Sequence, residues 1–391
     1  MLLKITAWLV AGVVLAQAQP EQIAKIKSSV TENLSRLPNY TCTETIQRSD
    51  RPKIGGRATL MQLETIRLEV AYVDGKELFG WPGAAKIDES DIGKMIDGST
   101  GTGYFALFSH SIFSTPSAAI QYGNAEEFEG KPAVRYDYRV PKKSGAYVIK
   151  GEAGQAAVDF HGSFWVNPTT LDLMRITAAI DDPPAVIGML SASSILDFDR
   201  QSIGSSTFVL PRKAQLAVVD ADGTEHENRL AIASCRQFVG ESVIKFDAPV
   251  DAPAAAPKAA IARIALPDDF TVEFSLDTPI EWATSAGGDP VHGTLRDSVP
   301  FNGGFVVPKG AGVSGRIAHL AMRGGLYYME LTLISLDFEG GHAGLDGRRN
   351  GVSVRDLPLI YQSTKFKLAR GARLSLHSRL LKSVHNDSIR P

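Results

Sequence analysis

The sequence has very few cysteines, and it contains no motif that gathers metal ligands at short spacing. Cys42 and Cys235 are the two cysteines among 391 residues. Neither a C-x-x-C nor an H-E-x-x-H spacing occurs, so the common local zinc-site patterns are excluded. The eight histidines are scattered along the chain, as ordinary surface and strand residues are. We therefore expect no bound metal ion and no cofactor.

The chain also lacks an excess of charge of either sign. Lysine and arginine together number 41, aspartate and glutamate number 43, and the formal net charge is -2. Proteins that bind nucleic acids or anionic membrane surfaces present a strongly basic face. This balance predicts no nucleic-acid partner.

Long apolar runs are absent after the first residues. No later window approaches the ~18 consecutive apolar residues that a membrane-spanning helix needs. At the N-terminus, Lys4 precedes a short apolar run over residues 5–15, and the tripeptide A-Q-A that follows is typical of a signal-peptide cleavage site. We expect residues 1–18 to be a cleaved signal peptide, so that the mature protein begins at Gln19. We expect the mature protein to be exported, periplasmic or associated with the cell envelope, and to have no transmembrane span. An uncleaved N-terminal anchor is the alternative.

Catalytic signatures are missing or badly placed. No G-x-S-x-G occurs. Ser242 and Lys245 match S-x-x-K, but the alternation around them is that of a strand, which points the two side chains to opposite faces. Glycoside hydrolysis requires a pair of carboxylates. The candidates for such a pair are Glu64, Glu69, Asp137 and Asp172. Carboxylates on strands usually face solvent, which is the alternative for these four. We assign no catalytic residue, and the sequence favours a non-enzymatic protein.

One helix and a long series of strands account for the first half. Apolar residues such as Ile26 and Val30 recur at helical spacing within 21–37, and Pro38 ends that pattern. From residue 40 the period changes to two, and Asp74-Gly75 has the composition of a tight hairpin turn. Segments 84–97 and 103–113 read as short helices among the strands. This pattern predicts a long antiparallel sheet with a few helices.

A change in composition divides the chain. Residues 248–260 are rich in alanine and proline and show no apolar periodicity, which is typical of a semi-rigid, extended linker. We expect this linker to separate a domain at 19–247 from a domain at 261–391. The second half has short alternating strands and glycine-rich turns, which predict a small β-barrel or sandwich. The expected fold class is mainly β with a few helices (α+β).

Several segments of the first half carry a family resemblance: "LPNYTCTETIQR", "ELFGWPGAAKI", "GTGYFALFSHSIF", "GSFWVNPTTLDLMRI" and "ENRLAIASCRQFVGESVIKFD". Together they cover most of residues 35–247 and resemble an uncharacterised family of exported proteins from soil bacteria of the Acidobacteria type. The element "FWVNPTTLDLMRI" is also similar to a hairpin of half-barrel lipoprotein-carrier and outer-membrane lipoprotein-sorting-like folds. That second resemblance implies a strongly curved antiparallel sheet with helices lying in its hollow.

The second half carries a different resemblance. From "FSLDTPIEWATSAGGDPVHGTLRDSV" through "VPKGAGVSGRI", it is similar to the β-barrel of scaffold proteins in conjugation and type IV secretion channels. The chain lacks the long helical antenna and the N-terminal membrane span of those proteins. The resemblance therefore implies a barrel fold and does not extend to a role in a channel.

Cys42 and Cys235 could be a nucleophile, metal ligands, a lipid anchor or a disulfide. No histidine signature accompanies either cysteine, two cysteines do not complete a metal site, and neither lies at the expected cleavage point. Export favours a disulfide. Cys42 lies in the first strand of the predicted domain and Cys235 in one of its last, and these strands meet if the sheet curls strongly. We predict a Cys42–Cys235 disulfide, and two separate buried thiols are the alternative.

Aromatic residues are concentrated in the segments expected to flank the hollow of the sheet. The six are Phe79, Trp81, Phe105, Phe108, Phe113 and Trp165. They form a candidate apolar groove for a lipid-like ligand. The alternative is that they fill the core between the sheet and its helices, because a sheet of this length must bury one face.

These patterns lead to one functional hypothesis and two alternatives. The leading hypothesis is an exported, non-enzymatic cell-envelope protein that binds an apolar, lipid-like ligand or an envelope protein partner. The first alternative is a structural or assembly module of an envelope complex. The second is a hydrolase that acts on cell-wall or carbohydrate substrates.

Overall fold

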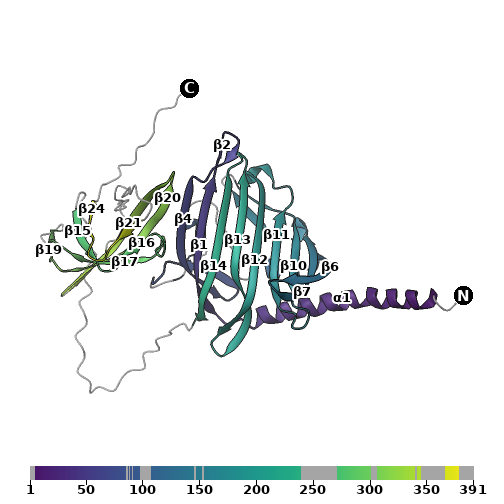
Figure 1. Cartoon of the computed structure of the whole chain (residues 1–391). Coiled ribbons are helices and arrows are strands. Elements are labelled where there is room, and N and C mark those ends of the chain that lie inside the picture. The colour runs from purple at the N-terminus through teal and green to yellow at the C-terminus, as the bar shows by residue number, and fades with distance from the viewer. Residues whose placement is uncertain are drawn as a thin grey trace, which may run out of the picture. The chain divides into compact units, whose positions relative to one another are not determined.

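The chain folds into two compact units, which a computed structural model describes at residues 5–84, 87, 89, 91–96, 107–144, 147–151, 154–238, 271–300, 306–339, 341–344 and 366–377 (Figure 1). The first unit consists of Met1–Leu60, Leu68–Gly80 and Ala84–Gly240. The second consists of Met61–Arg67, Trp81–Gly83 and Glu241–Pro391. The linker expected at 248–260 lies outside the described residues, and the expected domain boundaries stay predictions.

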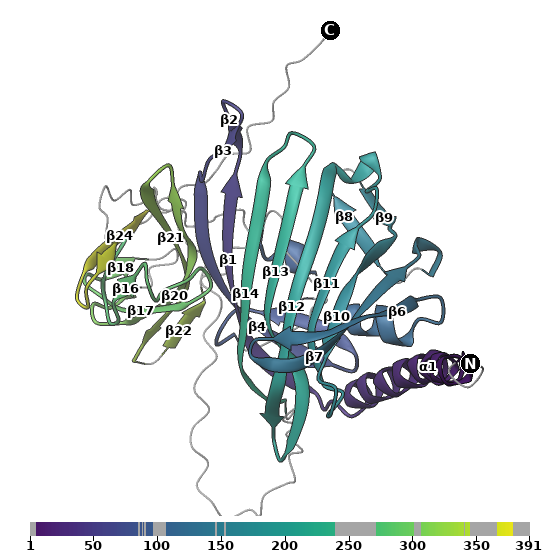
Figure 2. The same cartoon turned by 45° about the vertical axis from the view of Figure 1, so that its right-hand side comes forward.

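A large antiparallel sheet forms the body of the first unit, and Figure 2 shows that it is strongly curved. The strand order is β4-β1-β14-β13-β12-β11-β10-β7-β6, with β5 beside β4. The strands are β1 (Tyr40–Arg51), β4 (Gln62–Val73, of which Leu68–Val73 belong here), β5 (Lys76–Gly80), β6 (Ala119–Phe128), β7 (Lys131–Val140), β10 (Phe160–Val166), β11 (Leu173–Ile180), β12 (Met189–Ile203), β13 (Ser206–Asp220) and β14 (Glu225–Gln237). Two small hairpins pair β2 (Lys53–Ile54) with β3 (Arg57–Ala58) and β8 (Val148–Gly151) with β9 (Gly154–Ala157). The mainly β, curved antiparallel fold expected from the sequence is confirmed.

One row of directly paired residues crosses seven strands and defines the buried face of this sheet. The row is Ile46, Leu230, Ala214, Leu196, Ile176, Phe164 and Tyr136, and every member is buried. Directly paired residues of an antiparallel sheet point to the same side. We call this side the inner face. The period-two alternation of the sequence places apolar side chains on it in strand after strand.

The expected hairpin turn at Asp74-Gly75 is confirmed. It joins β4 to β5, and both turn residues have positive φ, 51° and 78°. A two-residue turn with two positive φ angles matches the right-handed twist of the strands that it connects. Asn39 assists, because its side-chain oxygen accepts a hydrogen bond from the backbone N–H of Asp74 at 3.0 Å.

The helices of the first unit are α1 (Ile5–Ser35), η1 (Ile92–Lys94), α2 (Leu107–Ser109), a π-helical turn η2 (His110–Ser114), η3 (Lys142–Ser144) and η4 (Ala185–Ile187). The apolar positions Ile26 and Val30 of α1 are buried, as their helical spacing predicts. The helix expected at 84–97 is much shorter, because Glu89 forms a bridge with Phe79 of β5 and Asp91 caps η1 through a hydrogen bond from Gly93. None of the helices in the described part of the chain has the length and apolar character needed to cross a bilayer.

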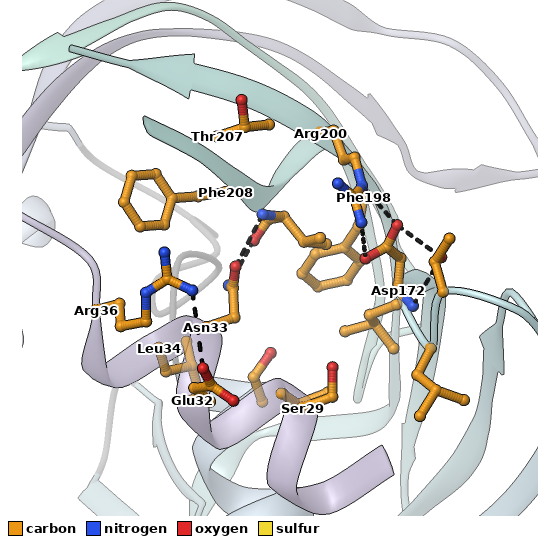
Figure 3. Close-up of a pocket in the computed structure, with 16 residues that line it drawn as sticks. Ser29, Glu32, Asn33, Leu34, Arg36, Asp172, Phe198, Arg200, Thr207 and Phe208 are labelled. Atoms are coloured by element: carbon orange, nitrogen blue, oxygen red, sulfur yellow. Dashed lines mark hydrogen bonds and ion pairs between the residues drawn. The ribbon is translucent and has the colours of Figure 1, made fainter. Parts of the chain in front are cut away.

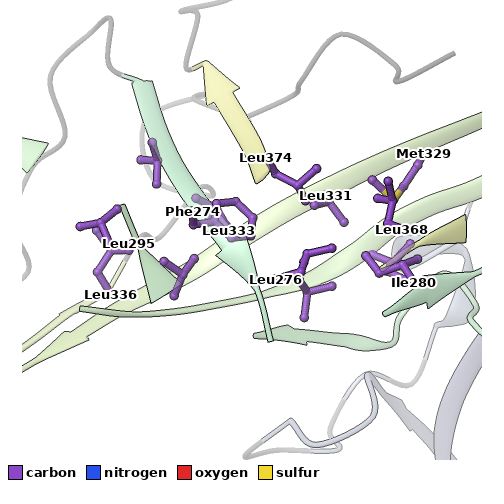
Figure 4. Close-up of a cluster of buried hydrophobic side chains, with 14 of the residues drawn as sticks. Phe274, Leu276, Ile280, Leu295, Met329, Leu331, Leu333, Leu336, Leu368 and Leu374 are labelled. Atoms are coloured by element: carbon purple, nitrogen blue, oxygen red, sulfur yellow. The ribbon is translucent and has the colours of Figure 1, made fainter. Parts of the chain in front are cut away.

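The second unit is a smaller β structure around its own apolar core. Its strands are β15 (Thr271–Leu276), β16 (Ile280–Glu281), β17 (Pro290–Leu295), β18 (Val299–Pro300), β19 (Val306–Val307), β20 (Gly312–Arg323), β21 (Leu326–Phe338), β22 (Gly341–Gly344), β23 (Lys367–Leu368) and β24 (Arg373–His377). They pair in the order β24-β15-β17-β20, with β21 on β20 and β22 on β21. Figure 4 shows that Phe274, Leu295 and Leu333 meet in this core.

Two short segments from the first third of the chain complete the second unit. Backbone hydrogen bonds join Arg67 N–H to the Gly287 carbonyl at 2.7 Å and Gly287 N–H to the Thr65 carbonyl at 2.8 Å. The Arg67 guanidinium forms a salt bridge with Asp289. Arg316 stacks 4.9 Å over the ring of Trp81. These contacts tie Met61–Arg67 and Trp81–Gly83 to residues more than two hundred positions later.

Replacing Gly288 by alanine is expected to destabilise the second unit by roughly 3 kcal/mol. Gly288 has φ of +96°, and a Cβ there would overlap the Arg67 carbonyl oxygen and lie 2.7 Å from Trp81 Cε3. A positive φ costs an L-residue ~1–2 kcal/mol and overpacking costs ~1–3 kcal/mol. Gly310 is the matched control, since its φ is +87° but nothing lies within 4 Å of its Cβ position. Thermal unfolding should show a clearly smaller loss for Gly310→Ala, and equal losses would contradict the close approach.

Candidate functional site

A cavity of about 230 Å³ lies in the first unit between the last turns of α1 and the sheet (Figure 3). Its walls come from the end of α1 and the following Arg36, from the β10–β11 turn and from the adjoining parts of β12 and β13. Phe198, Phe208 and Leu173 supply buried apolar surface. Polar side chains, including Asn33 and Arg200, line much of the rest, together with further apolar residues of α1, the β10–β11 turn and β13.

Asn33 fixes the last turns of α1 against the sheet. Its side-chain amide donates to the Val209 carbonyl and its side-chain oxygen accepts from the Val209 N–H, both at 3.0 Å. The ladder between β13 and β14 begins at Lys213, so the backbone of Val209 has hydrogen-bonding groups left for another partner. The Asn33 side chain therefore pairs with the backbone of Val209 as a neighbouring strand would, and it closes one wall of the cavity.

The β10–β11 turn forms a second wall. The Asn167 side-chain oxygen accepts hydrogen bonds from the backbone N–H groups of Thr169 at 2.9 Å and Thr170 at 3.0 Å. This Asx-type turn is the mechanism by which "VNPTTLD" reverses the chain. Leu171 then adopts a positive φ of 58°, which is unusual for a branched apolar residue. The turn thus presents Leu171 and Asp172 to the cavity.

The charged groups at the cavity are paired. Arg200 forms two hydrogen bonds to Asp172, at 2.7 Å and 3.0 Å, and this partner raises the pKa of Arg200. Arg36 lies 3.8 Å from Glu32, one helical turn away. The cavity therefore combines an apolar floor with a charge-balanced polar rim. Among the described residues that line it, there is no histidine or cysteine.

Three of the aromatic residues selected from the sequence are buried. Phe108 packs against Phe160 with ring centroids 6.0 Å apart, and Phe113 packs against Phe164 at 4.9 Å. These contacts place α2 and η2 on the inner face. Phe79 is buried in β5.

The structure does not bring the whole set of six aromatics together. Trp165 lies on the opposite face of β10 from Phe164, where it packs near Phe128 and donates a hydrogen bond to Glu126. Trp81 belongs to the second unit, and Phe105 lies outside the described residues. None of the five that are described lines the cavity. A groove at Phe79, Phe108 and Phe113 stays a prediction.

The four carboxylates weighed for glycoside hydrolysis each have a partner. A carboxylate engaged in this way is already compensated and is a poor candidate for a shared acid/base pair. The contacts are Glu64 with His319, Glu69 with Arg236, Asp137 with Ser163 and Arg135, and Asp172 with Arg200.

The sequence did not indicate the residues of the cavity. Nothing in the sequence analysis concerned Asn33 or Arg200, and Asp172 was considered only as a strand carboxylate of a kind that usually faces solvent. The usable signal was the turn sequence "VNPTTLD", because its Asn-Pro pair fixes where the chain reverses. Which other segments meet that turn depends on long-range pairing.

Cys42 and Cys235 are joined by a disulfide, with Cα atoms 4.1 Å apart. The bond sits at an irregularity of the β1–β14 ladder, where Cys42 alone faces two residues of β14. Ser234 has a positive φ of 54° there, as the first residue of a bulge of this kind requires. The bulge redirects β14 so that Cys235 reaches Cys42. The structure therefore contains the bond that the sequence favours.

His226 connects three neighbouring strands at the other end of the same ladder. Its Nδ1 lies 2.8 Å from Asp50 Oδ1 in β1, and its Nε2 lies 2.8 Å from Asp220 Oδ2 in β13. Both ring nitrogens donate only in the charged imidazolium. Hydrogen bonds first to Asp50 and then to Asp220 raise the pKa of His226, against the opposing effect of burial.

Replacing His226 by asparagine is expected to cost roughly 1 kcal/mol below pH 6.5, a value reduced for solvent screening. The folded pKa is raised above the unfolded one, so the contribution is fully present below the unfolded pKa and is lost as pH rises through the folded value. Urea unfolding at a series of pH values measures the difference between wild type and variant. The exposed His292 provides the control, His292→Asn. A His226→Asn effect that does not shrink as pH rises would rule out the charged clamp.

No family model matches the sequence, and no curated protein matches it. Among solved structures, a DUF1329 family protein from Desulfovibrio piger aligns with a TM-score of 0.31 and 13% identity, over 57% of this chain and 94% of that one. A domain described as an outer membrane lipoprotein-sorting protein domain from Vibrio parahaemolyticus aligns with a TM-score of 0.31 and 12% identity, over 56% and 94%. A LolA superfamily protein from Nitrosomonas europaea aligns with a TM-score of 0.26 and 9% identity, over 56% and 94%.

These TM-scores are too low for the likeness to carry an argument about function. Two of the three structures bear names from the lipoprotein-sorting group that the first half of the sequence resembles. None of the three is described as a scaffold protein of a secretion channel. Function must be argued from the site of this chain.

Proposed function

We propose that this chain is an exported, non-enzymatic binding protein of the cell envelope that takes up a lipid-like, amphipathic ligand between α1 and the inner face. The observation that carries the proposal is the cavity under α1, with its apolar floor and charge-balanced rim. A disulfide supports export, because such bonds persist in oxidising compartments. The leader-like composition of residues 1–18 supports the same view.

The size of the cavity sets the mode of binding. Pockets for small ligands usually measure ~300–1,000 Å³, whereas this cavity measures about 230 Å³. It accommodates a short chain or part of a ligand as it stands. A longer lipid-like ligand requires α1 to move away from the sheet.

Two buried side chains and two hydrogen bonds are among the contacts that hold the described part of α1. Burial of Ile26 and Val30 contributes about 1.5–3 kcal/mol each, and the two Asn33–Val209 hydrogen bonds about 0.5–1.5 kcal/mol each. A ligand of micromolar affinity supplies about 8 kcal/mol. The two amounts are comparable, so exchange of α1 for a ligand is energetically feasible.

Replacing Thr207 by tryptophan is expected to weaken binding of a fluorescent fatty acid, dansyl-undecanoate, by at least about tenfold. Thr207 is exposed at the cavity rim, so a large side chain there obstructs the cavity without entering the core. Ser206→Trp is the matched control, because Ser206 is also exposed, is adjacent on β13 and points to the other side of the strand. Fluorescence titration compares the two variants with the wild type.

The proposal fails on either of two results. One is that wild-type protein does not bind the fatty acid and carries no extractable lipid when purified from its native envelope. The other is that Thr207→Trp and Ser206→Trp bind as the wild type does, which would place the ligand elsewhere.

A further inference from the structure

Ser109 places a buried hydroxyl group in the wall of the cavity under α1. It lines that cavity and is 4% exposed. The other lining residues that are buried carry apolar side chains: Val30, Leu173, Phe198 and Phe208. The Ser109 hydroxyl makes no capping hydrogen bond to the turn that follows it, and none to another described residue. A buried hydroxyl without a partner is unfavourable and requires an explanation.

The neighbours of Ser109 fix its position without help from the hydroxyl. Ser109 is the last residue of α2 and directly precedes the π-helical turn η2. Before it, Phe108 packs against Phe160 with ring centroids 6.0 Å apart, and after it, Phe113 packs against Phe164 at 4.9 Å. Turns of the π-helical kind occur frequently at functional sites. The hydroxyl is therefore held beside the cavity by packing and is available to a ligand.

The charged side chains of the cavity lie at its rim. Glu32, Arg36 and Arg200 keep 66%, 62% and 58% of their side-chain surface exposed. Asp172 is half-buried, but Arg200 compensates its charge through two hydrogen bonds. None of the buried lining residues is charged, so a charged ligand group at Ser109 would be desolvated without a compensating charge from them. The ligand group that meets Ser109 is therefore uncharged, and a charged head group stays at the rim.

We propose that the cavity under α1 takes an amphipathic ligand whose apolar chain carries an uncharged hydrogen-bonding oxygen, and that Ser109 binds this oxygen. The inference rests on the proposed function, because it names the ligand class for the same cavity. A serine hydroxyl both donates and accepts, so it pairs with a hydroxyl or a carbonyl oxygen. A hydroxylated fatty acid is the simplest ligand of this class.

Ser109 in this role determines specificity, and the order of affinities that it imposes differs from that of a purely apolar cavity. Transfer of a chain hydroxyl from water to an apolar site is costly, so hydrophobic binding alone favours the plain fatty acid. A plain chain leaves the Ser109 hydroxyl buried without a partner, whereas a hydroxylated chain satisfies both hydroxyl groups. Removal of the Ser109 hydroxyl should therefore reverse the preference.

Displacement of dansyl-undecanoate from the full chain tests the proposal. The competitors are ω-hydroxyoctanoate, ω-hydroxydecanoate and ω-hydroxydodecanoate, each compared with the plain acid of the same length, so that the hydroxyl is offered at several depths. At one chain length or more, the wild type should bind the hydroxy acid about tenfold more tightly than the plain acid. Ser109→Ala should bind the plain acid more tightly at every length.

Ser114→Ala is the matched control, because Ser114 is an exposed serine of η2 that does not line the cavity. This variant should keep the preference of the wild type. If the wild type does not bind dansyl-undecanoate, the proposed function fails and this inference falls with it. If it binds but prefers the plain acids at every length, the role of Ser109 alone is wrong. A preference for hydroxy acids that persists in Ser109→Ala also overturns that role.

Discussion

Removing the Cys42–Cys235 disulfide is expected to lower the free energy of unfolding of the first unit by about 5 kcal/mol. The bond joins residues 193 positions apart, so it restricts the unfolded chain over most of that unit. In the chain-entropy model the stabilisation grows with the logarithm of loop length, which places this bond near the upper end of the usual range. The loss equals a large fraction of the stability of an ordinary domain.

Urea unfolding of Cys42→Ala/Cys235→Ala measures this effect. The double variant avoids a free thiol, and the wild type in reductant should match it. Because each unit has its own core, we expect the transition of the second unit to stay in place, whereas Gly288→Ala should shift that transition alone. Equal midpoints for wild type and double variant would show that the bond does not stabilise the fold.

Local patterns in the sequence predicted much of the first unit. The helical spacing of Ile26 and Val30 identified the buried side of α1, and Asp74-Gly75 identified a hairpin turn. Both features depend on residues close in sequence, where backbone preference and periodicity act directly. The disulfide could also be predicted from the sequence, because two cysteines in an exported chain have one possible intramolecular pairing.

Contacts between residues far apart in the sequence could not be predicted in the same way. Arg67 meets Asp289 across 222 positions, and nothing local to either residue indicates the other. The register of the strands pairs Ile46 with Leu230 and continues along the row of buried residues to Tyr136. That register depends on the pairing of all seven strands together. The cavity under α1 is a product of the same pairings, since its walls come from segments that are distant in sequence.

Glu44 shows where the sequence carried a signal that was not used. In "YTCTETI", the residues Tyr40, Cys42, Glu44 and Ile46 alternate with threonines, so Glu44 shares a face with three residues that are usually buried. An acid in an otherwise apolar row breaks the binary pattern of the strand. Such local violations are concentrated at functional or strained sites.

Replacing Glu44 by glutamine is expected to make the protein more stable at alkaline pH, by roughly 3 kcal/mol at pH 9. Burial raises the pKa of Glu44 from 4.5 to about 8 in the folded state. For a carboxyl whose folded pKa lies above its unfolded value, the folded state binds the proton more tightly, so stability falls as pH rises from about 4.5 through about 8. The full penalty corresponds to the shift at ~1.36 kcal/mol per unit, less the cost of burying the glutamine amide.

The pH dependence separates this effect from a simple change in packing. Glutamine has nearly the same shape as glutamate and does not titrate, so the difference in unfolding free energy between Glu44→Gln and wild type should grow between pH 5 and pH 9. Glu127→Gln, at an exposed position of β6, should show a small and constant difference. Urea unfolding at each pH gives both curves. If the Glu44→Gln difference does not change with pH, then Glu44 is not a buried acid with a raised pKa.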